Sequence, residues 1–430
     1  LLATLFLGLA MSGAWHHYQK HRRSFWYFGA LVMTLTVVLI FYLNFKYGAS
    51  QDPQLDAPHE VRDRDYFYLW SFSALGVWIA LGLASLWAGM ASLLPSRAGA
   101  MATPRRLLLV APLVVAVAMV PLWSNWSAAS RRGDTTTVAF AHDLLNSVEP
   151  YAVLVTAGDN DTFPLWYAQE VEGIRKDVVV VVLSLMNTDW FARGILRRPI
   201  YTYDATNGPA VYRSGVWPKP KSPPLKMTLA QADSVPQYAV LREPVVFRGA
   251  GLDVTIDPRN LSPDGSGGGI LERADILVLR MISDSWPQRP VYISRTTGGY
   301  AQRMGLGDHM LTQGLAQALI RSPGTAASDV VRIEGDGWFD VARSRLLWRD
   351  VFQGPAAVLR KGTWVDRPSL SAPFAYFVAG TSLAQILQQR GDTASAGSIN
   401  DTLKKMARVM RIDDLFEPTP GASSSEAERK

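Results

Sequence analysis

Two carboxylates and an amide stand side by side in the sequence, at Asp159, Asn160 and Asp161. Two carboxylates held close together can bind a divalent cation, or can divide the roles of acid and base when their pKa values differ. The same residue types also form turns and cap helices through local hydrogen bonds. The residues alone therefore favour a turn first, with a binding site on top of it as the second interpretation.

The segments around this acidic turn predict where it lies in the fold. An apolar run at 151–155 is typical of a buried strand, and Pro164 suits the first turn of a helix over 165–172. Asp161 or Thr162 can cap that helix. The acidic turn then lies at the carboxyl end of a strand, which is the edge where open α/β sheets bind ligands.

A second strand-to-helix turn follows. The valine-rich run at 177–187 predicts a strand that is buried on both faces, and 187–196 predicts another helix. This alternation implies parallel strands joined by a right-handed crossover. Asp189 and Trp190 begin the second helix, so we expect them near the same edge. Trp166, Tyr167 and Trp190 could then stack on a sugar face, although such residues usually belong to a core.

The remaining elements are predicted from shorter patterns. Residues 270–286 and 306–320 read as helices, and 290–294 reads as a strand. Two amphipathic stretches at 374–390 and 393–411 are joined by Gly391 and Asp392, which suit a helix end and a helix start. They predict one helical hairpin of tetratricopeptide type, which must pack on the α/β domain because a single copy forms no solenoid.

Composition excludes several classes of function. The 430-residue chain has no cysteine, which rules out disulfides, zinc-thiolate sites and cysteine nucleophiles. Its net charge of +6 comes with no dense Lys/Arg run, so nucleic acid is not an expected partner. His309 lacks neighbouring ligands at the spacing of a zinc site. We expect neither a metal nor another cofactor.

The first part of the chain predicts a membrane domain. Four apolar runs occupy residues 1–15, 25–45, 67–94 and 107–123, and the last three carry no charge and approach the ~20 residues that span a bilayer. Basic residues follow the first run and lie between the third and fourth, whereas the intervening loop is acidic. By the positive-inside rule, everything after residue 124 lies in the periplasm or an equivalent exterior space. The predicted domains are 1–124 (four membrane helices), 125–370 (exterior α/β, parallel βαβ core), 371–416 (hairpin) and 417–430 (disordered tail).

The outer loop contains a second candidate for chemistry, "EVRDRDYFYLW" at 60–70. Charges of alternating sign precede four aromatic residues directly above a membrane helix. One interpretation is an interfacial anchor whose charges pair among themselves. The other is a rim, formed by Arg62, Arg64 and Asp65, that holds an anionic lipid-linked substrate with an arginine on its phosphate.

Three segments carry a family resemblance: "RDRDYFYLWSFSALGVWIALG", "TAGDNDTFPLWYAQEVEGIRKDVVVVVLSLMNTDWF" and "RPVYIS". They resemble the domain-of-unknown-function 2723 family, which includes transmembrane protein 260, over roughly residues 25–320. The resemblance implies a polytopic glycosyltransferase of the GT-C type, and its eukaryotic members imply protein O-mannosylation from a lipid-phosphate sugar. In such enzymes an acid in the first exterior loop is essential. This chain begins after that loop, so the resemblance implies a carboxyl-terminal portion whose catalytic acid lies elsewhere, and the Gly-rich stretch 296–310 is shorter than in the family.

These observations combine into two functional hypotheses. In the first, the chain is part of an enzyme that moves a sugar from a polyprenyl-phosphate carrier to a protein or glycan acceptor at the exterior face of the inner (plasma) membrane. In the second, the exterior domain is a membrane-tethered binding or assembly module without chemistry. The predicted substrate-binding residues are Arg62, Arg64, Asp65, Asp159, Asn160, Asp161, Asp189 and Trp190.

Overall fold

The computed structural model describes residues 2–45, 65–94, 104–322, 329–333, 337–362 and 370–412. The chain divides into two compact units, Leu1–Ser130 and Arg131–Lys430. The predicted disordered tail after residue 417 lies outside the described residues.

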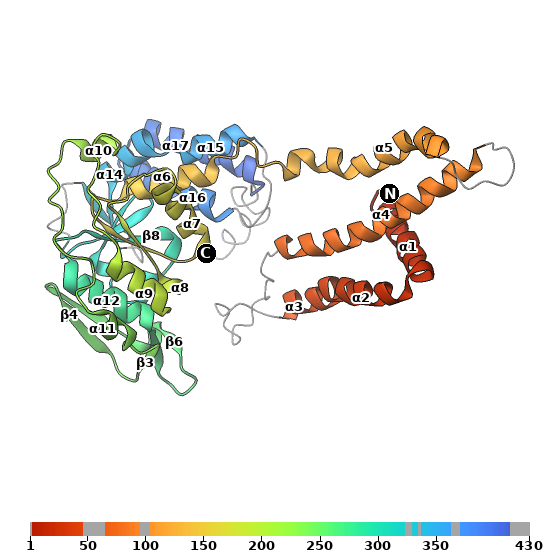
Figure 1. Cartoon of the computed structure of the whole chain (residues 1–430). Coiled ribbons are helices and arrows are strands. Elements are labelled where there is room, and N and C mark those ends of the chain that lie inside the picture. Colours follow the sequence, from red (N-terminus) through yellow and green to blue (C-terminus); the bar gives the residue numbers. More distant parts are fainter. Residues whose placement is uncertain are drawn as a thin grey trace, which may run out of the picture. The chain divides into compact units, whose positions relative to one another are not determined.

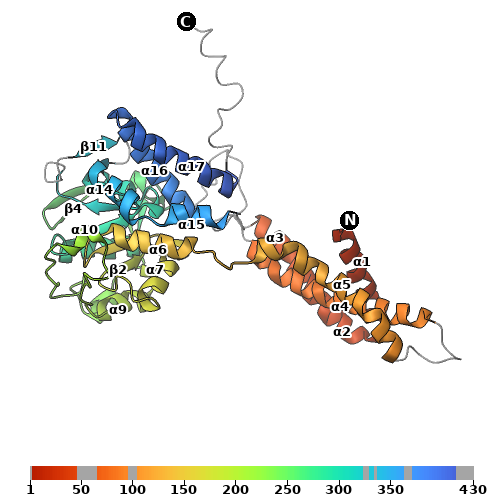
Figure 2. The same cartoon turned by 90° about the horizontal axis from the view of Figure 1, so that it is seen from above.

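The amino-terminal unit is helical (Figures 1 and 2). In the described part of the chain, three helical segments are long and apolar enough to cross a membrane: Arg22–Leu43, Tyr68–Leu93 and Pro104–Ala129. The first of these is α2, a π-helical turn and α3 in succession. The elements of this unit are α1 (Leu2–Lys20), α2 (Arg22–Met33), the π turn Thr34–Val38, α3 (Leu39–Phe45), the 3-10 turn Asp65–Phe67, α4 (Tyr68–Leu93) and α5 (Pro104–Ala129).

The fourth predicted span is a helix, but it is not among these membrane-spanning candidates. The apolar part of α1 ends at Trp15 and is followed by His16, His17 and Lys20. At 1.5 Å per residue this apolar part is only about 20 Å long, against a hydrocarbon core of about 30 Å. Three membrane spans are therefore supported, and a fourth is not confirmed.

Glycines set the packing of α1 on α4. A Cβ on Gly13 would lie 1.8 Å from the carbonyl oxygen of Trp78, and one on Gly82 would lie 2.1 Å from that of Leu9. The two backbones thus touch where only glycine leaves room, as at small-residue contacts between membrane helices.

The carboxyl-terminal unit is built on a sheet whose described strands run in the order β11-β12-β9-β10-β8-β1-β2. β1 pairs in parallel with β2 on one side and with β8 on the other, whereas β10 is antiparallel to β8 and β9. The strands are β1 (Val153–Thr156), β2 (Val179–Val182), β8 (Val291–Ser294), β9 (Met310–Gln313), β10 (Ala316–Leu319), β11 (Val330–Ile333) and β12 (Gly337–Asp340).

Helices cover both faces of this sheet (Figure 1). Leu154 and Val180 point into the core on one face, while Val153, Val155 and Val181 point into the core on the other, so alternation along β1 and β2 fills both cores with aliphatic side chains. The first face carries α6 (Thr136–Ser147), α7 (Asp159–Glu170), α14 (Val341–Leu346), α15 (Gly354–Lys361), α16 (Ser371–Gln389) and α17 (Thr393–Met410). The second carries α8 (Leu183–Met186), α9 (Asp189–Arg197), α12 (Arg273–Ser285) and α13 (Tyr300–Arg303).

Smaller elements complete the unit. Tyr212 of α10 (Ala210–Arg213) donates a hydrogen bond to the carbonyl of Ser147 at 2.9 Å. Helix α11 (Leu229–Asp233) precedes a small sheet of β3 (Tyr238–Leu241), β7 (Gly269–Glu272) and β6 (Ser262–Pro263), and β4 (Val245–Gly249) and β5 (Leu252–Ile256) form a separate hairpin. The described part of this unit also contains the 3-10 turns Pro258–Asn260, Arg295–Thr297 and Gly307–His309 and the π turn Leu347–Val351.

The structure corrects several predictions. The strand predicted at 177–187 is shorter, because β2 ends at Val182 and residues 183–186 form α8. The sheet is mixed rather than parallel, because antiparallel strands extend the parallel trio of β1, β2 and β8. The helix predicted at 306–320 is wrong: this segment contains the hairpin of β9 and β10, and Gly314 turns it with a φ of +63°, which has no place inside a helix.

The predicted carboxyl-terminal hairpin is present as α16 and α17. Gly391 has a φ of +82°, and the Asp392 side chain accepts the backbone N–H of Ser395 at 3.1 Å, as the sequence predicts for a helix end followed by a helix start. The hairpin packs in the same core as α6 and α7.

Candidate binding site at the carboxyl edge of the sheet

The carboxyl ends of three parallel strands meet at one edge. Because β1, β2 and β8 run in the same direction, Thr156, Val182 and Ser294 end together. The chain leaves β1 through α7 on one face to reach β2, and it reaches β8 through α12 on the other face. The connections at β1 and β8 therefore lie on opposite faces of the sheet. The point between two such strands is where ligands bind in open α/β sheets.

Asp161 fills this position with its own side chain. The residue is 4% exposed, and its carboxylate accepts the backbone N–H groups of Ala157 at 2.9 Å and Gly158 at 3.0 Å. The hydroxyl of Thr296, just after β8, donates to the same carboxylate at 2.5 Å, and that of Thr162 donates at 3.3 Å. The carboxylate thus ties the start of α7 to the end of β8.

Asp159 and Asn160 lie in the first turn of α7 and are exposed. The helix begins at Asp159, six residues before the predicted start at 165, because Gly158 takes the N-cap position and Asp161 bonds back from the third helical residue. Within the described parts of the chain, neither side chain has a hydrogen-bonding partner. Their position is that of acidic and amide residues that stabilise a helix N-terminus.

Asp189 is the first residue of α9 and also has a structural partner. Its carboxylate accepts a hydrogen bond at 2.5 Å from Arg273, whose side chain is fully buried. Arg273 also donates to the carbonyl of Ala232 at 2.8 Å. Asn187 lies beside this pair and accepts the backbone N–H of Ala274 at 2.9 Å. Asp189 therefore compensates a buried charge and joins the starts of α9 and α12.

These contacts limit the chemistry of the acidic turn. Both oxygens of Asp161 already accept hydrogen bonds from backbone or hydroxyl donors, so the carboxylate is not free to bind a cation. The described residues contain no group of three His, Asp or Glu side chains placed to hold a metal ion. The turn interpretation accounts for every observed contact of Asp161.

A groove opens beside this edge, around the outer side of β2. It has a volume of about 520 Å³ and runs between α7 and α9, which lie on opposite faces of the sheet. Trp166 packs against both cores, and its ring lies 6.1 Å from that of Phe191. Together with Val180 of β2, these rings form the apolar floor of the groove.

Polar side chains cover the sheet edge at the floor. Gln169 is buried, and its amide donates to the carbonyls of Arg175 at 2.8 Å and Val178 at 2.9 Å. Its own carbonyl accepts Arg198 at 3.4 Å. These bonds satisfy backbone groups near the start of an edge strand, a structural role that such edges need.

The walls of the groove are more open. Trp190 is 60% exposed and meets Phe191 edge-on, with a centroid separation of 5.6 Å. Arg197 is exposed, and Gly194 lies between these two residues on α9. At the far end, Glu170 pairs with Lys176 at 2.9 Å and with Arg198 at 3.6 Å. The groove thus combines aromatic faces with a charged end, which is typical of sites for small polar ligands.

The sequence also predicted substrate-binding residues in the outer loop, at Arg62, Arg64 and Asp65. Arg62 and Arg64 lie outside the described residues. Asp65 begins the 3-10 turn Asp65–Phe67 that leads into α4, in the other unit.

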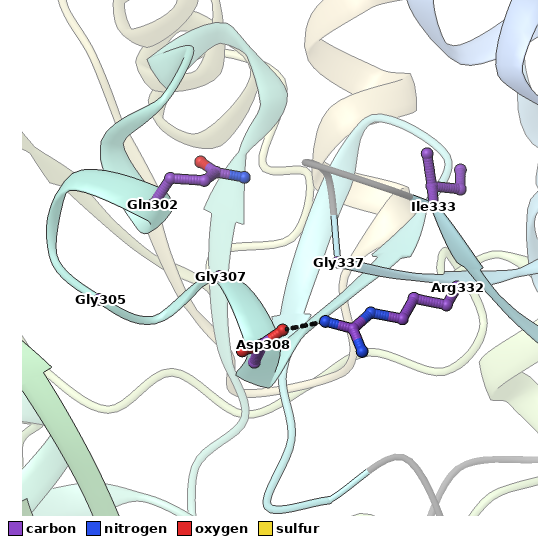
Figure 3. A pocket seen from close by; sticks show the side chains of 7 residues that line it. All are labelled: Gln302, Gly305, Gly307, Asp308, Arg332, Ile333 and Gly337. Atoms are coloured by element: carbon purple, nitrogen blue, oxygen red, sulfur yellow. Dashed lines mark hydrogen bonds and ion pairs between the residues drawn. The ribbon is translucent and has the colours of Figure 1, made fainter.

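A second pocket, of about 640 Å³, lies at the opposite edge of the sheet (Figure 3). It is bounded by the segments that precede β9 and β12, and these strands begin where β1 and β8 also begin. Asp308 and Arg332 form an exposed ion pair there at 3.0 Å. The pocket contains none of the predicted site residues.

Sequence reasoning missed several of the groove residues. Gly194, Arg197, Arg198 and Tyr201 all line it. A usable signal was present, because Trp190, Gly194 and Arg197 are spaced i, i+4 and i+7 and so share one helix face. The partners Arg273 and Thr296 had no such signal, since they lie 84 and 135 residues away from Asp189 and Asp161.

Comparison with known proteins identifies one region. Residues 137–213 match the family described as TMEM260-associated domain 2. This range contains α6 except for its first residue, α7 to α10, both strand-to-helix turns and all residues that line the groove. No curated protein and no solved structure matches the chain. The match is consistent with the resemblance to transmembrane protein 260.

Proposed function

We propose that the chain is the carboxyl-terminal part of a polytopic membrane glycosyltransferase, which moves a sugar from a polyprenyl-phosphate carrier to a protein or glycan acceptor. In this proposal the carboxyl-terminal unit is exterior and binds sugar-containing substrate. The observation that carries it is the aromatic groove, which lies wholly inside the region that matches the TMEM260-associated domain. Three helices that can span a membrane agree with a lipid-linked donor.

The groove offers a physical basis for sugar binding. The C–H groups on one face of a pyranose are weakly positive and suit the electron-rich face of an indole ring. Trp190 presents such a face to solvent, and the side chains at the charged end can orient hydroxyl groups. The contribution to catalysis would be the positioning of a substrate. We assign the role of proton acceptor to no residue of this chain.

A transfer assay tests the proposal. Membranes that contain the protein from its complete reading frame are given polyprenyl-phosphate [14C]mannose, and label in protein and glycan is counted. We expect incorporation that depends on the gene and falls at least tenfold in Trp190→Ala. The control Arg259→Gln alters an exposed arginine outside the groove and should transfer as wild type. Gene-independent label, or full transfer by Trp190→Ala, would contradict the proposal.

The exterior location has its own test. A phosphatase that is active only outside the cytosol, fused after Ala129, should be active because α5 is proposed to exit outward. Activity of a cytosolic reporter at the same position would remove the lipid-linked donor from consideration.

The second candidate, a binding or assembly module without chemistry, has one observation in its favour. Asp161 and Asp189 are both engaged in structural contacts. This candidate predicts binding at the groove without any gene-dependent sugar transfer in the assay above.

A further inference from the structure

The starting observation is a glycine that packing does not require. Gly194 lies inside the nine-residue helix α9, and a Cβ built on it meets no atom within 4 Å. Its backbone is not left-handed. Glycine is a poor helix former, so neither the fold nor the backbone benefits from it at this position. Its effect is that no side chain covers the helix surface at this point of the groove.

Those neighbours are Trp190 and Arg197, which lie on the same face of α9 at i−4 and i+3. Seven residues of helix separate them by about 10 Å along the axis. Gly194 therefore leaves a flat path of this length between an exposed indole ring and a guanidinium group, and all three residues line the groove. Such a path accommodates one ring with a charged substituent.

The charges at the path favour an anion. The guanidinium of Arg197 forms no hydrogen bond or ion pair within the described part of the chain. The charge of Arg197 acts on the nearby Asp233 carboxylate, but that carboxylate already accepts two hydrogen bonds from the guanidinium of Arg193, each at 2.8 Å. Arg198 also lines the groove, and its buried Nε has no hydrogen-bonding partner there. The one carboxylate in the lining, Glu170, pairs with Lys176 at 2.9 Å and with Arg198 at 3.6 Å, so Arg197 is the guanidinium that these pairs leave for a ligand.

We propose that the groove binds a sugar ring that carries an anionic group, with the ring on Trp190, its substituent across Gly194, and the anion on the guanidinium of Arg197. The anion is a carboxylate, as in a uronic acid, or a phosphate ester. Arginine presents planar paired donors that match either group. The identity of the ring as a sugar rests on the proposed function, whereas the anion site rests on the arginines.

Binding is measured on the 430-residue chain in detergent micelles, by ligand-observed NMR titration. The probes are glucuronic acid, mannose 1-phosphate, methyl mannoside and inorganic phosphate. We expect both acidic sugars to bind at least tenfold more tightly than methyl mannoside, and inorganic phosphate to bind weakly because it lacks the ring. Binding of only one acidic sugar would identify the anion as a carboxylate or a phosphate ester.

Matched variants assign the binding to the path. Arg197→Gln and Gly194→Leu should each weaken binding of the acidic sugar at least tenfold. Arg259→Gln and Gly397→Leu are the controls, since Gly397 is an interior residue of α17 whose added Cβ also meets no atom within 4 Å. The melting temperature of every variant is recorded, and a folded Gly194→Leu is expected because the site is open.

Three results would overturn the inference: equal binding of methyl mannoside and the acidic sugars, wild-type affinity in folded Gly194→Leu, or no binding of either acidic sugar at millimolar concentration. None of these depends on transfer. If the acidic sugars bind as expected but no gene-dependent transfer is found, the proposed enzyme fails and the binding site stands.

Discussion

The carboxyl edge of the sheet and the neighbouring groove differ in whether their polar and aromatic side chains contact other parts of the protein. At the carboxyl edge, Asp161 and Asp189 are engaged by partners from distant parts of the chain. In the groove, Trp190 and Arg197 are exposed, and the glycine between them fills no packing requirement. The sequence favoured the acidic residues as a binding site. In the structure, the exposed side chains of the groove are the ones that a ligand can reach.

The difference concerns what a buried polar group needs. A buried carboxylate must accept hydrogen bonds, and a buried guanidinium must donate them, so such groups pair with each other or with the backbone during folding. An acidic cluster in a sequence therefore often marks a junction between elements. Side chains that folding leaves unused, as in the groove, are the better indication of a ligand.

The largest change in stability is expected at Asp143 of α6, which is fully buried. It accepts the backbone N–H groups of Gln353 and Gly354, each at 2.8 Å, and the Tyr376 hydroxyl at 2.6 Å. Asp143→Ala would leave these donors unpaired and should lower the free energy of unfolding by about 4 kcal/mol. Denaturant unfolding of the purified chain measures this loss, and a loss below about 1 kcal/mol would break the rule that buried carboxylates here are structural.

Asp143 also predicts a dependence on pH. Burial raises the pKa of its carboxyl from 3.8 to about 7, against the opposing effect of its hydrogen bonds. The folded state therefore keeps a proton that the unfolded state has released, so this contribution to stability is full below about pH 4 and is lost as pH rises to about 7. Asp143→Asn should flatten the wild-type decline over this window. An unchanged pH profile in Asp143→Asn would assign the dependence to other groups.

The next effect compares two neighbours in the acidic turn. Asp161→Ala removes the acceptor of two backbone N–H groups and the Thr296 hydroxyl, and it should lower the free energy of unfolding by about 3 kcal/mol. Asp159→Ala, two residues earlier and exposed, should change it by less than about 0.5 kcal/mol. Thermal unfolding of both variants measures the contrast. Equal effects would mean that the buried contacts of Asp161 have little weight.

A smaller contrast separates Asp189 from Trp190. Asp189→Ala leaves the buried Arg273 with one partner fewer and should cost about 2 kcal/mol of stability. Trp190→Ala should cost under about 0.5 kcal/mol, since the ring is mostly exposed, yet it should abolish binding of the acidic sugars. The same titration and unfolding measurements show whether stability and binding separate between adjacent residues. A Trp190→Ala variant that loses stability instead would place the ring in the core.

Elements that depend on local signals could be predicted from the sequence, whereas elements that depend on contacts between distant segments could not. The strands at β1, β2 and β8 and the hairpin of α16 and α17 follow from apolar runs and helix-end signals, which are local. The hairpin of β9 and β10 did not follow, because its apolar residues fit a helix nearly as well as two short strands. Its pairing with β8 and β12, which decides the matter, is a tertiary contact.

The residues of the candidate site also divide into those placed by local structure and those placed by distant contacts. The position of the acidic turn at a strand end could be predicted, because it depends on elements adjacent in sequence. The hydrogen bonding of Asp161 could not, since it depends on Thr296, which follows β8 and lies 135 residues away in the sequence. Trp190 was predicted to bind substrate, and Trp166 to stack with it on a sugar face. That both line one groove could not be predicted, because it depends on α7 and α9 lying on opposite faces of the sheet beside β2.

The smallest effect gives the sharpest comparison. Gly194→Ala and Gly397→Ala each place a methyl group in open space on a helix, so each should raise the free energy of unfolding by about 0.5–1 kcal/mol through helix propensity. Heat unfolding should show two equal increases. Only Gly194→Ala should also weaken the binding of glucuronic acid or mannose 1-phosphate, because only that methyl group stands on the path between Trp190 and Arg197. A glycine whose loss stabilises the fold and impairs binding is maintained for the ligand, whereas a decrease in stability at Gly194 would return it to a structural role.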